Sequence, residues 1–247
     1  MKRSTSDSLE RFYSLLAHLA QAPGQGRPLR ELPVRAFLPT RGVYFFMETR
    51  EFRCANPDVP RIVRVGTHAV SSGSRSTLRG RLKQHLGTRA GGGNHRGSIF
   101  RLHVGNALLA RDGPPLPTWG VGSTAPAAVR DCESTRAAEA AYEKRVSEYI
   151  GAMSVLWIDV PDEPGSQSDR ALIEQNSIAL LSNQCAPIDC ASESWLGRFS
   201  PRREIRESAL WNLNYVADVC DPTFLERFEV FVQRTCEGGL RLTKRCT

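Results

Sequence analysis

The sequence predicts an α+β fold in which a small mixed sheet is covered by helices. Three observations favour it: two strand-like segments follow each other closely, several segments have the period of amphipathic helices, and no internal repeat is present. The chain of 247 residues is long enough for one large domain or two small ones, each with a buried core.

A helix and a hairpin are the first expected elements. Apolar residues recur at helical spacing over residues 8–21, and a segment with one proline and two glycines at 22–26 ends that helix. β-branched and aromatic residues predict strands over 42–47 and 62–66. The connection between these strands is short and rich in turn residues, so we expect them to pair as an antiparallel hairpin.

The rest of the chain alternates between helices and strands. Leu78, Leu82 and Leu86 form the apolar stripe of a helix over 77–86, and alternating polar and apolar residues predict a third strand over 98–104. An irregular insert begins near residue 113. Four further elements are expected, the last of them in a C-terminal appendage: a helix over 135–150, a strand over 155–160, an apolar helix over 169–182 and a helix over 222–232.

Positive charge is concentrated in one segment. The chain has 33 Lys and Arg against 26 Asp and Glu, a formal charge of +7, yet residues 61–111 contain no acidic residue. Such a block favours a polyanionic partner, most often nucleic acid, over a merely solvated basic face. Ten basic residues lie in this block: Arg61, Arg64, Arg75, Arg79, Arg81, Lys83, Arg89, Arg96, Arg101 and Arg111. Four of the five histidines lie there too: His68, His85, His95 and His103.

Several classes of protein are disfavoured. No apolar run approaches the length of a membrane-spanning helix, and the N-terminus lacks the apolar stretch of a signal peptide. Seven cysteines cannot all pair within the chain. We therefore expect a cytoplasmic protein with free thiols and no membrane contact. The phosphate-loop and dinucleotide fingerprints are both absent.

Four residues are candidates for chemistry. Arg81 and His85 are four residues apart on one helix, so they share a face, where Arg could bind a phosphate and His could relay a proton or hydrogen-bond that phosphate. Two exposed polar residues would be the simpler interpretation. Glu174 falls on or near the buried face of its helix, where a divalent metal or a structural salt bridge would explain a carboxylate. Tyr44, taken alone, is most simply a core aromatic residue.

The order of these features resembles the GIY-YIG nuclease family. The matching segments are Gly42-Val43-Tyr44, Arg64-Val65-Gly66, the helix with Arg81, the apolar helix with Glu174, and Asn183. The resemblance covers roughly residues 40–190. The Arg-x-x-x-His arrangement and the long insert are most similar to the restriction-endonuclease branch.

The resemblance implies both a fold and its division. The family fold is a small central antiparallel sheet flanked by helices. On this basis residues 1–37 form an N-terminal helical extension, residues 38–190 form the nuclease-like domain with an insert at about 112–150, and residues 191–247 form a C-terminal helical extension.

The resemblance also implies metal-dependent endonuclease activity on DNA, with Mg²⁺ or Mn²⁺, possible homodimerisation on duplex DNA, and a role in restriction or phage defence. Tyr44 would orient or deprotonate the attacking water, and Arg81 would neutralise the scissile phosphate. His85 would accept a proton or bind the phosphate. Glu174 would bind the metal, and Asn183 matches the late asparagine of the family.

One substitution departs from the family pattern. Arg64 stands where the second motif usually has a tyrosine, and arginine cannot act as an acid or base near neutral pH. Either the chemistry is slower, or His85 takes the base role. A fold that has lost catalysis and only binds nucleic acid is the alternative function.

DNA contacts are expected mainly from basic residues around the second helix, directed at phosphates. These residues are Arg75, Arg79, Lys83, Arg89, His95 and Arg96. Base readout would have to come from the insert or from the C-terminal extension, whose candidates are Arg198, Arg202, Arg203 and Arg206.

Overall fold

A computed structural model describes residues 5–32, 38–113, 116–121, 132–184 and 187–243. The described residues contain a four-stranded sheet in the order β1-β4-β2-β3, and each pair of neighbours is antiparallel. The strands are β1 (Arg27–Pro28), β2 (Gly42–Phe52), β3 (Pro60–Gly66) and β4 (Ser154–Asp159). The α+β fold and the β2–β3 hairpin predicted from the sequence are thus confirmed.

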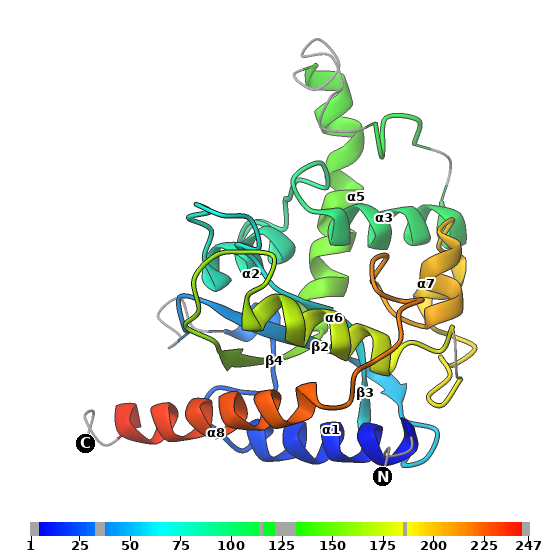
Figure 1. The fold of residues 1–247 in the computed structure, drawn as a ribbon. Helices are drawn as coiled ribbons and strands as arrows, with labels where there is room; N and C mark the ends of the chain where they lie inside the picture. Colours follow the sequence, from blue (N-terminus) through cyan, green and yellow to red (C-terminus); the bar gives the residue numbers. More distant parts are fainter. Residues whose placement is uncertain (1–4, 33–37, 114–115, 122–131, 185–186, 244–247) are drawn as a thin grey trace.

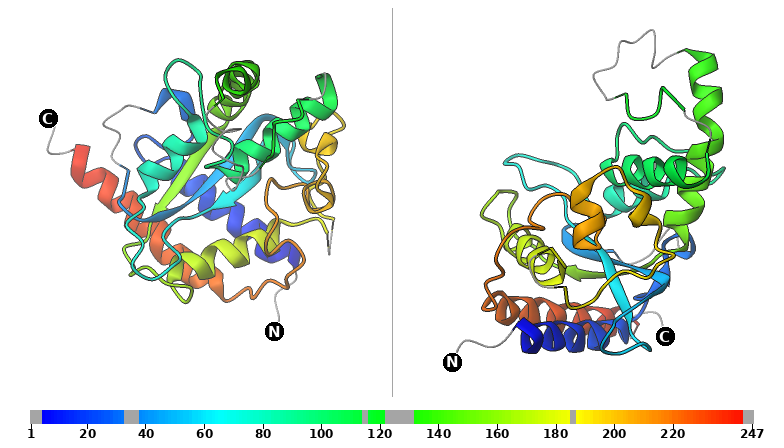
Figure 2. Two further views of the ribbon diagram at one scale, coloured as in Figure 1. Left: turned by 90° about the horizontal axis from the view of Figure 1, so that it is seen from above. Right: turned by 90° about the vertical axis from the view of Figure 1, so that its right-hand side faces the viewer.

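Three helices cover one face of the sheet: α1 (Thr5–Ala20), α6 (Asp169–Leu181) and α8 (Phe224–Thr243). Helices α1 and α8 lie side by side as one layer beneath the sheet (Figures 1 and 2). Phe12 of α1 stacks on Phe228 of α8 with ring centroids 5.0 Å apart, and both pack against Phe45 of β2. The two terminal helices therefore share one hydrophobic core with the sheet.

The opposite face carries helices α2 (Leu78–Leu86), α3 (Ile99–Asp112) and α5 (Glu133–Ala152). The right-hand view of Figure 2 shows α3 and α5 above the sheet. The C-terminal segment also reaches this face through the short elements η2 (Leu196–Phe199) and α7 (Arg203–Ser208), and η1 (Leu29–Glu31) follows β1. The part of the chain that the structure describes contains no helix long and apolar enough to cross a membrane.

The predicted strand over 98–104 is wrong, because these residues begin helix α3. Ser98 caps this helix by accepting a hydrogen bond from the amide of Arg101. Arg101 is completely buried and His103 is 4% exposed, so the polar members of the alternating pattern point inward as well. Two other differences are smaller: the two-residue strand β1 was not predicted, and α8 continues beyond the expected end at residue 232.

The C-terminal segment covers the outer edge of β3. The Trp211 amide donates to the Val63 carbonyl at 2.7 Å. The Asn212 side chain holds both backbone groups of Val65, accepting from its N–H at 3.1 Å and donating to its C=O at 2.8 Å. These hydrogen bonds pair backbone groups at the edge of β3 that would otherwise be open, close to the end of this strand at Gly66.

We expect Asn212→Ala to lower the free energy of unfolding by about 2 kcal/mol, because two backbone groups of Val65 are left without their partner in a buried place. Urea denaturation of the whole chain measures this effect. The matched control is Asn214→Ala, two residues later and exposed, which should change stability by less than about 0.5 kcal/mol. Equal stability of the two variants would contradict the edge-pairing role.

Candidate active site

The two motif strands meet at one end of the sheet. Tyr44 of β2 lies opposite Gly66 of β3 in the strand register. Immediately after β3, the Thr67 hydroxyl donates to the Gly42 carbonyl at 2.8 Å, and the Thr67 amide donates to Glu174 Oε1 at 3.1 Å. Thr67 therefore ties the start of β2 and the end of β3 to helix α6.

A buried hydrogen bond joins Tyr44 to His85. The Tyr44 hydroxyl lies 2.7 Å from His85 Nε2, and neither side chain has any solvent-exposed surface. Helix α2 presents His85 here because its first amide, that of Leu78, donates to the Thr40 carbonyl just before β2. The other ring nitrogen, Nδ1, lies 3.0 Å from the Ser98 hydroxyl.

The His85 ring is neutral in this setting. Burial lowers its pKa well below the usual value, and the positive charges of Arg64, Arg81 and Arg101 lower it further. Both ring nitrogens are engaged inside the protein, so this arrangement leaves no nitrogen for a direct contact with a phosphate. The hydrogen-bond neighbours of the ring are therefore Tyr44 at Nε2 and Ser98 at Nδ1.

Arg81 lies on α2 one turn before His85 and is partly exposed. Its Nη1 donates to Gln84 at 3.3 Å, and its buried Nε has no hydrogen-bond partner among the described residues. Its charge acts on the pKa values of His68, His85 and Glu174. The guanidinium thus stands near the residues that the sequence placed in one site.

Glu174 is a partly exposed carboxylate at the edge of this cluster. Burial raises its pKa, while Arg64, the Thr67 amide and Arg81 oppose that rise. The described residues contain no group of three or more His, Cys, Asp or Glu side chains that could hold a metal ion. A single carboxylate nevertheless fits Mg²⁺, which commonly binds one or two carboxylates and completes its shell with water and phosphate oxygens.

Arg64 is only 7% exposed and faces the same side of the sheet as Tyr44. Its guanidinium lies over the Phe100 ring, 4.5 Å from the centroid, and Nη1 donates to the Trp211 carbonyl. The buried Nε of Arg64 has no hydrogen-bond partner in the part of the chain described. Arg64 thus connects the C-terminal segment to α3 while its charge reaches His85 and Glu174.

Asn183 is not brought to this cluster. Helix α6 ends at Leu181, about 10 Å along the helix axis from Glu174. The side chain of Asn183 stabilises the turn that follows. Its Nδ2 donates to the Asp189 carbonyl at 2.6 Å, and its Oδ1 accepts from the backbone amides of Ile188 and Asp189. Its place in the fold is that of a turn residue.

The acid-free basic block is not one surface in the folded chain, because several of its side chains reach acidic residues outside the block. These ion pairs are Arg61 with Glu51, Arg96 with Glu139, Arg101 with Glu143, and Arg111 with Asp112.

Two residues of the expected DNA-contacting set lie in these internal contacts. His95 is 1% exposed, binds Glu143 through Nδ1 at 2.9 Å and stacks on Trp119 at 3.9 Å. Arg96 donates two hydrogen bonds to Glu139. The structure therefore removes both from the expected interface. Four members remain, on α2 and its flanking loops: Arg75, Arg79, Lys83 and Arg89.

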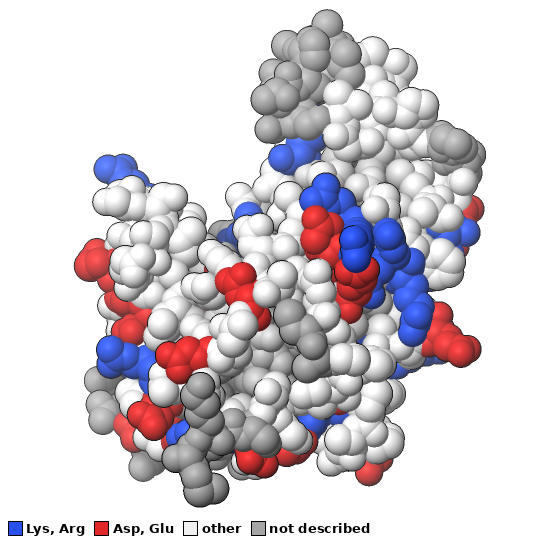
Figure 3. Space-filling model, turned by 45° about the vertical axis from the view of Figure 1, so that its right-hand side comes forward, with Lys and Arg blue, Asp and Glu red and all other residues white. Residues whose placement is uncertain are grey.

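The C-terminal arginines lie in a mixed surface. Figure 3 shows basic and acidic side chains interleaved on the face that carries α7. Arg202 pairs with Glu204 and Arg203 with Glu207, whereas Arg198 and Arg206 donate to backbone carbonyls. These contacts all lie within residues 191–207, so they stabilise the C-terminal segment itself. Residues 114–115 and 122–131 of the expected insert lie outside the described residues.

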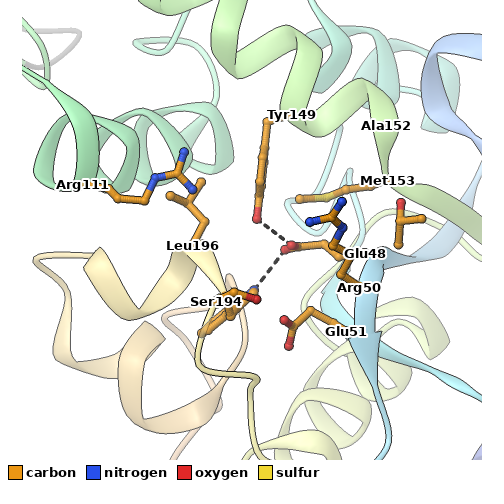
Figure 4. A pocket seen from close by; sticks show the side chains of 11 residues that line it. Glu48, Arg50, Glu51, Arg111, Tyr149, Ala152, Met153, Ser194 and Leu196 are labelled. Carbon is orange, nitrogen blue, oxygen red and sulfur yellow. Dashed lines mark hydrogen bonds between the residues drawn. The ribbon is translucent and has the colours of Figure 1, made fainter. Parts of the chain in front are cut away.

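A separate pocket of about 400 Å³ lies at the other end of β2, between α5 and residues 194–196 (Figure 4). Its floor holds Glu48, which accepts hydrogen bonds from the Tyr149 hydroxyl at 2.5 Å and from the indoles of Trp195 and Trp211 at 3.0 and 2.9 Å. Burial raises the pKa of Glu48, and these three donors oppose that rise. Glu48 is four residues from Tyr44, about 13 Å along the strand, and holds α5 and the C-terminal segment to β2.

Sequence reasoning missed the residues that support the site. Ser98 was hidden by the wrong strand assignment, although a serine directly before a helical pattern is a capping signal. Thr67, Trp211 and Asn212 form hydrogen bonds in which at least one partner is a backbone group, and such bonds leave no recognisable pattern in the sequence.

The chain matches the model of a known family. A model described as the GIY-YIG domain matches residues 3–238, a region that includes α1, the whole sheet and most of α8. Neither the search of curated proteins nor the search of solved structures gave a significant match.

We expect Gly66→Ala to disturb the site directly. A Cβ at residue 66 would lie 2.2 Å from the Tyr44 hydroxyl oxygen, and the Tyr44 ring is packed against Phe46 and His85. We expect the unfolding free energy to fall by about 1–3 kcal/mol from overpacking, measured by urea denaturation. Gly165→Ala, where a Cβ meets nothing within 4 Å, is the control and should be near neutral. Unchanged stability of Gly66→Ala would contradict the close approach.

Proposed function

The chain belongs to the GIY-YIG family, and we propose that it is a metal-dependent endonuclease that hydrolyses phosphodiester bonds in DNA. One observation carries this proposal beyond family membership. Tyr44, His85, Arg81 and Glu174 come from β2, α2 and α6 and converge at one end of the sheet.

In this proposal Tyr44 orients the attacking water, and His85 fixes the Tyr44 oxygen through their 2.7 Å hydrogen bond. His85 itself is a poor proton acceptor because its pKa lies well below the usual value. Tyr44 has no exposed surface in this structure, so the proposal requires that water reaches its hydroxyl when DNA is bound.

The charged residues act on the phosphate. Arg81 is partly exposed, and its buried Nε has no hydrogen-bond partner among the described residues, so it is the residue suited to bind the scissile phosphate and the charge that develops on it. Glu174 would hold Mg²⁺ or Mn²⁺, which supplies Lewis-acid stabilisation of phosphoryl oxygens when bound. The charge of Arg64 adds to the positive field around His85 and Glu174.

A second candidate function is nucleic-acid binding without catalysis. The observation in its favour is Arg64, which stands in place of the second-motif tyrosine and whose Nη1 is occupied by the Trp211 carbonyl. Under this alternative DNA binding persists, and the site does not cleave.

The finer role follows from the resemblance. We propose a role in restriction or phage defence, supported by the similarity of the Arg81 and His85 arrangement to that branch. A single active site cuts one strand at a time, so cleavage of both strands calls for a homodimer on duplex DNA or for two sequential nicks.

The cleavage assay uses supercoiled plasmid and single-stranded circular DNA with Mg²⁺, Mn²⁺ or EDTA. We expect metal-dependent nicking or linearisation by the wild type, and at least about a 100-fold loss of rate in Glu174→Ala with DNA binding retained. Glu226→Ala, an exposed carboxylate on α8, is the matched control and should cleave normally. Cleavage by Glu174→Ala would overturn the metal assignment. Salt-sensitive binding without cleavage by the wild type would favour the second function.

The basic side chains around α2 give a separate prediction. Replacing Arg75, Lys83 and Arg89 with Ala should reduce the slope of log K against log salt on duplex DNA by about 0.9 for each phosphate that is no longer neutralised. The control replaces Arg227 and Arg234 of α8, which pair with Asp169 and Asp159. Fluorescence anisotropy at several salt concentrations measures both slopes. The same slope in both variants would show that DNA does not lie along α2.

A further inference from the structure

The Ser98 hydroxyl makes two contacts, one with the start of helix α3 and one with the His85 ring. Its hydroxyl oxygen is the N-cap of α3, accepting from the Arg101 amide at 3.4 Å, and it lies 3.0 Å from His85 Nδ1. The residue is 1% exposed. The cap therefore ties the start of α3 to the ring that faces Tyr44.

The hydroxyl proton of Ser98 determines the direction of these bonds. Among the described residues the hydroxyl has two hydrogen-bond neighbours, the Arg101 amide and His85 Nδ1. The amide can only donate, so the buried hydroxyl proton has His85 Nδ1 as its acceptor. A neutral imidazole that accepts at Nδ1 carries its own proton on Nε2. His85 Nε2 then donates to the Tyr44 oxygen across the 2.7 Å contact.

The surroundings of His85 agree with this direction. The opposite arrangement would have Tyr44 donate to Nε2 and would leave the Ser98 proton without an acceptor. The present direction instead leaves the Tyr44 proton without an acceptor among the described residues, on the hydroxyl that must face water in the proposed function. A doubly protonated ring is disfavoured, since burial and the charges of Arg64 on β3, Arg81 on α2 and Arg101 on α3 lower the pKa of His85. Arg101 also donates to the His85 carbonyl at 2.8 Å, which holds the end of α2 against α3.

We propose that Ser98 is a positioning residue that holds His85 in the Nε2–H tautomer, so that His85 donates to the Tyr44 oxygen. One lone pair of that oxygen is then occupied, and the Tyr44 O–H points away from His85, where it orients the attacking water once water reaches the hydroxyl on DNA binding. The catalytic consequence rests on the proposed nuclease function. The choice of tautomer also draws on that function, because one of the two hydroxyl protons must be left for water, but the tautomer can be measured without DNA.

Nitrogen NMR of the whole chain labelled with ¹⁵N-histidine tests the tautomer without DNA. We expect His85 of the wild type to carry its proton on Nε2. Ser98→Thr keeps both the hydroxyl and the cap and should keep this tautomer. Ser98→Ala removes the donor and should give the Nδ1–H form or a mixture.

Ser168→Ala separates positioning from capping. Ser168 caps α6 in the same way, accepting from the Ala171 amide at 3.3 Å, and its hydroxyl makes no hydrogen bond with His85 in the described part of the chain. We expect this variant to become less stable, as Ser98→Ala does, but to keep the wild-type tautomer. An Nδ1–H ring in the wild type, or an unchanged ring in Ser98→Ala, would overturn the proposal.

Cleavage kinetics test the consequence. We expect Ser98→Ala to lower kcat by about 10- to 100-fold, by analogy with the loss of a group that orients a metal-bound histidine, with KM nearly unchanged. Ser98→Thr should restore kcat, and Ser168→Ala should behave like the wild type. Equal kcat in Ser98→Ala and Ser168→Ala would overturn the catalytic role. If the wild type cleaves no DNA, the nuclease proposal fails, whereas the NMR result still decides the role of Ser98.

Discussion

The hydrogen bond between Tyr44 and His85 constrains the rest of the site. Both groups are completely buried, and a buried polar group without a partner is costly, so each must find its partner inside the protein. Tyr44 is fixed by the register of β2 with β3, and His85 is fixed by α2. The second nitrogen of His85 then requires Ser98, the N-cap residue of α3. One polar chain thus sets the positions of two helices relative to the sheet.

The C-terminal segment completes the same structure from the other side. Asn212 and the Trp211 amide close the edge of β3, and the Trp211 carbonyl accepts from Arg64. A guanidinium at position 64 is too polar to be buried without such an acceptor. The replacement of the usual tyrosine by Arg64 and the docking of residues 211–212 are therefore physically coupled: the segment satisfies the cation, and the cation holds the segment.

Much of the fold could be predicted because periodicity reports directly on burial. The hairpin, α2, α5, β4 and α6 each show a single clear pattern, and the structure places them as expected. The strand predicted over 98–104 was wrong because the alternation of apolar residues at 100, 102 and 104 fits a strand. In the structure this segment is helical, and its polar residues Arg101 and His103 are buried too; Arg101 forms an ion pair with the distant Glu143. The order of the motifs in the sequence nominates Tyr44, Arg81, His85 and Glu174 as candidates, and the structure brings their elements to one end of the sheet. Ser98 and the turn position of Asn183 could not be found in this way, since both depend on where a helix begins or ends.

The distribution of charge shows why a run in the sequence is not yet a surface. Arg61, Arg96 and Arg101 belong to an interval without acids, yet each is held by a glutamate outside that interval, at position 51, 139 or 143. Ion pairs formed on folding thus remove part of the basic block from the solvent. The cations that remain on or beside α2 gather around the helix that also carries Arg81 and His85. Because one helix presents both sets, a phosphate backbone drawn to its outer face would be positioned by the same rigid element that supports Tyr44, so binding and orientation at the site have a common structural origin.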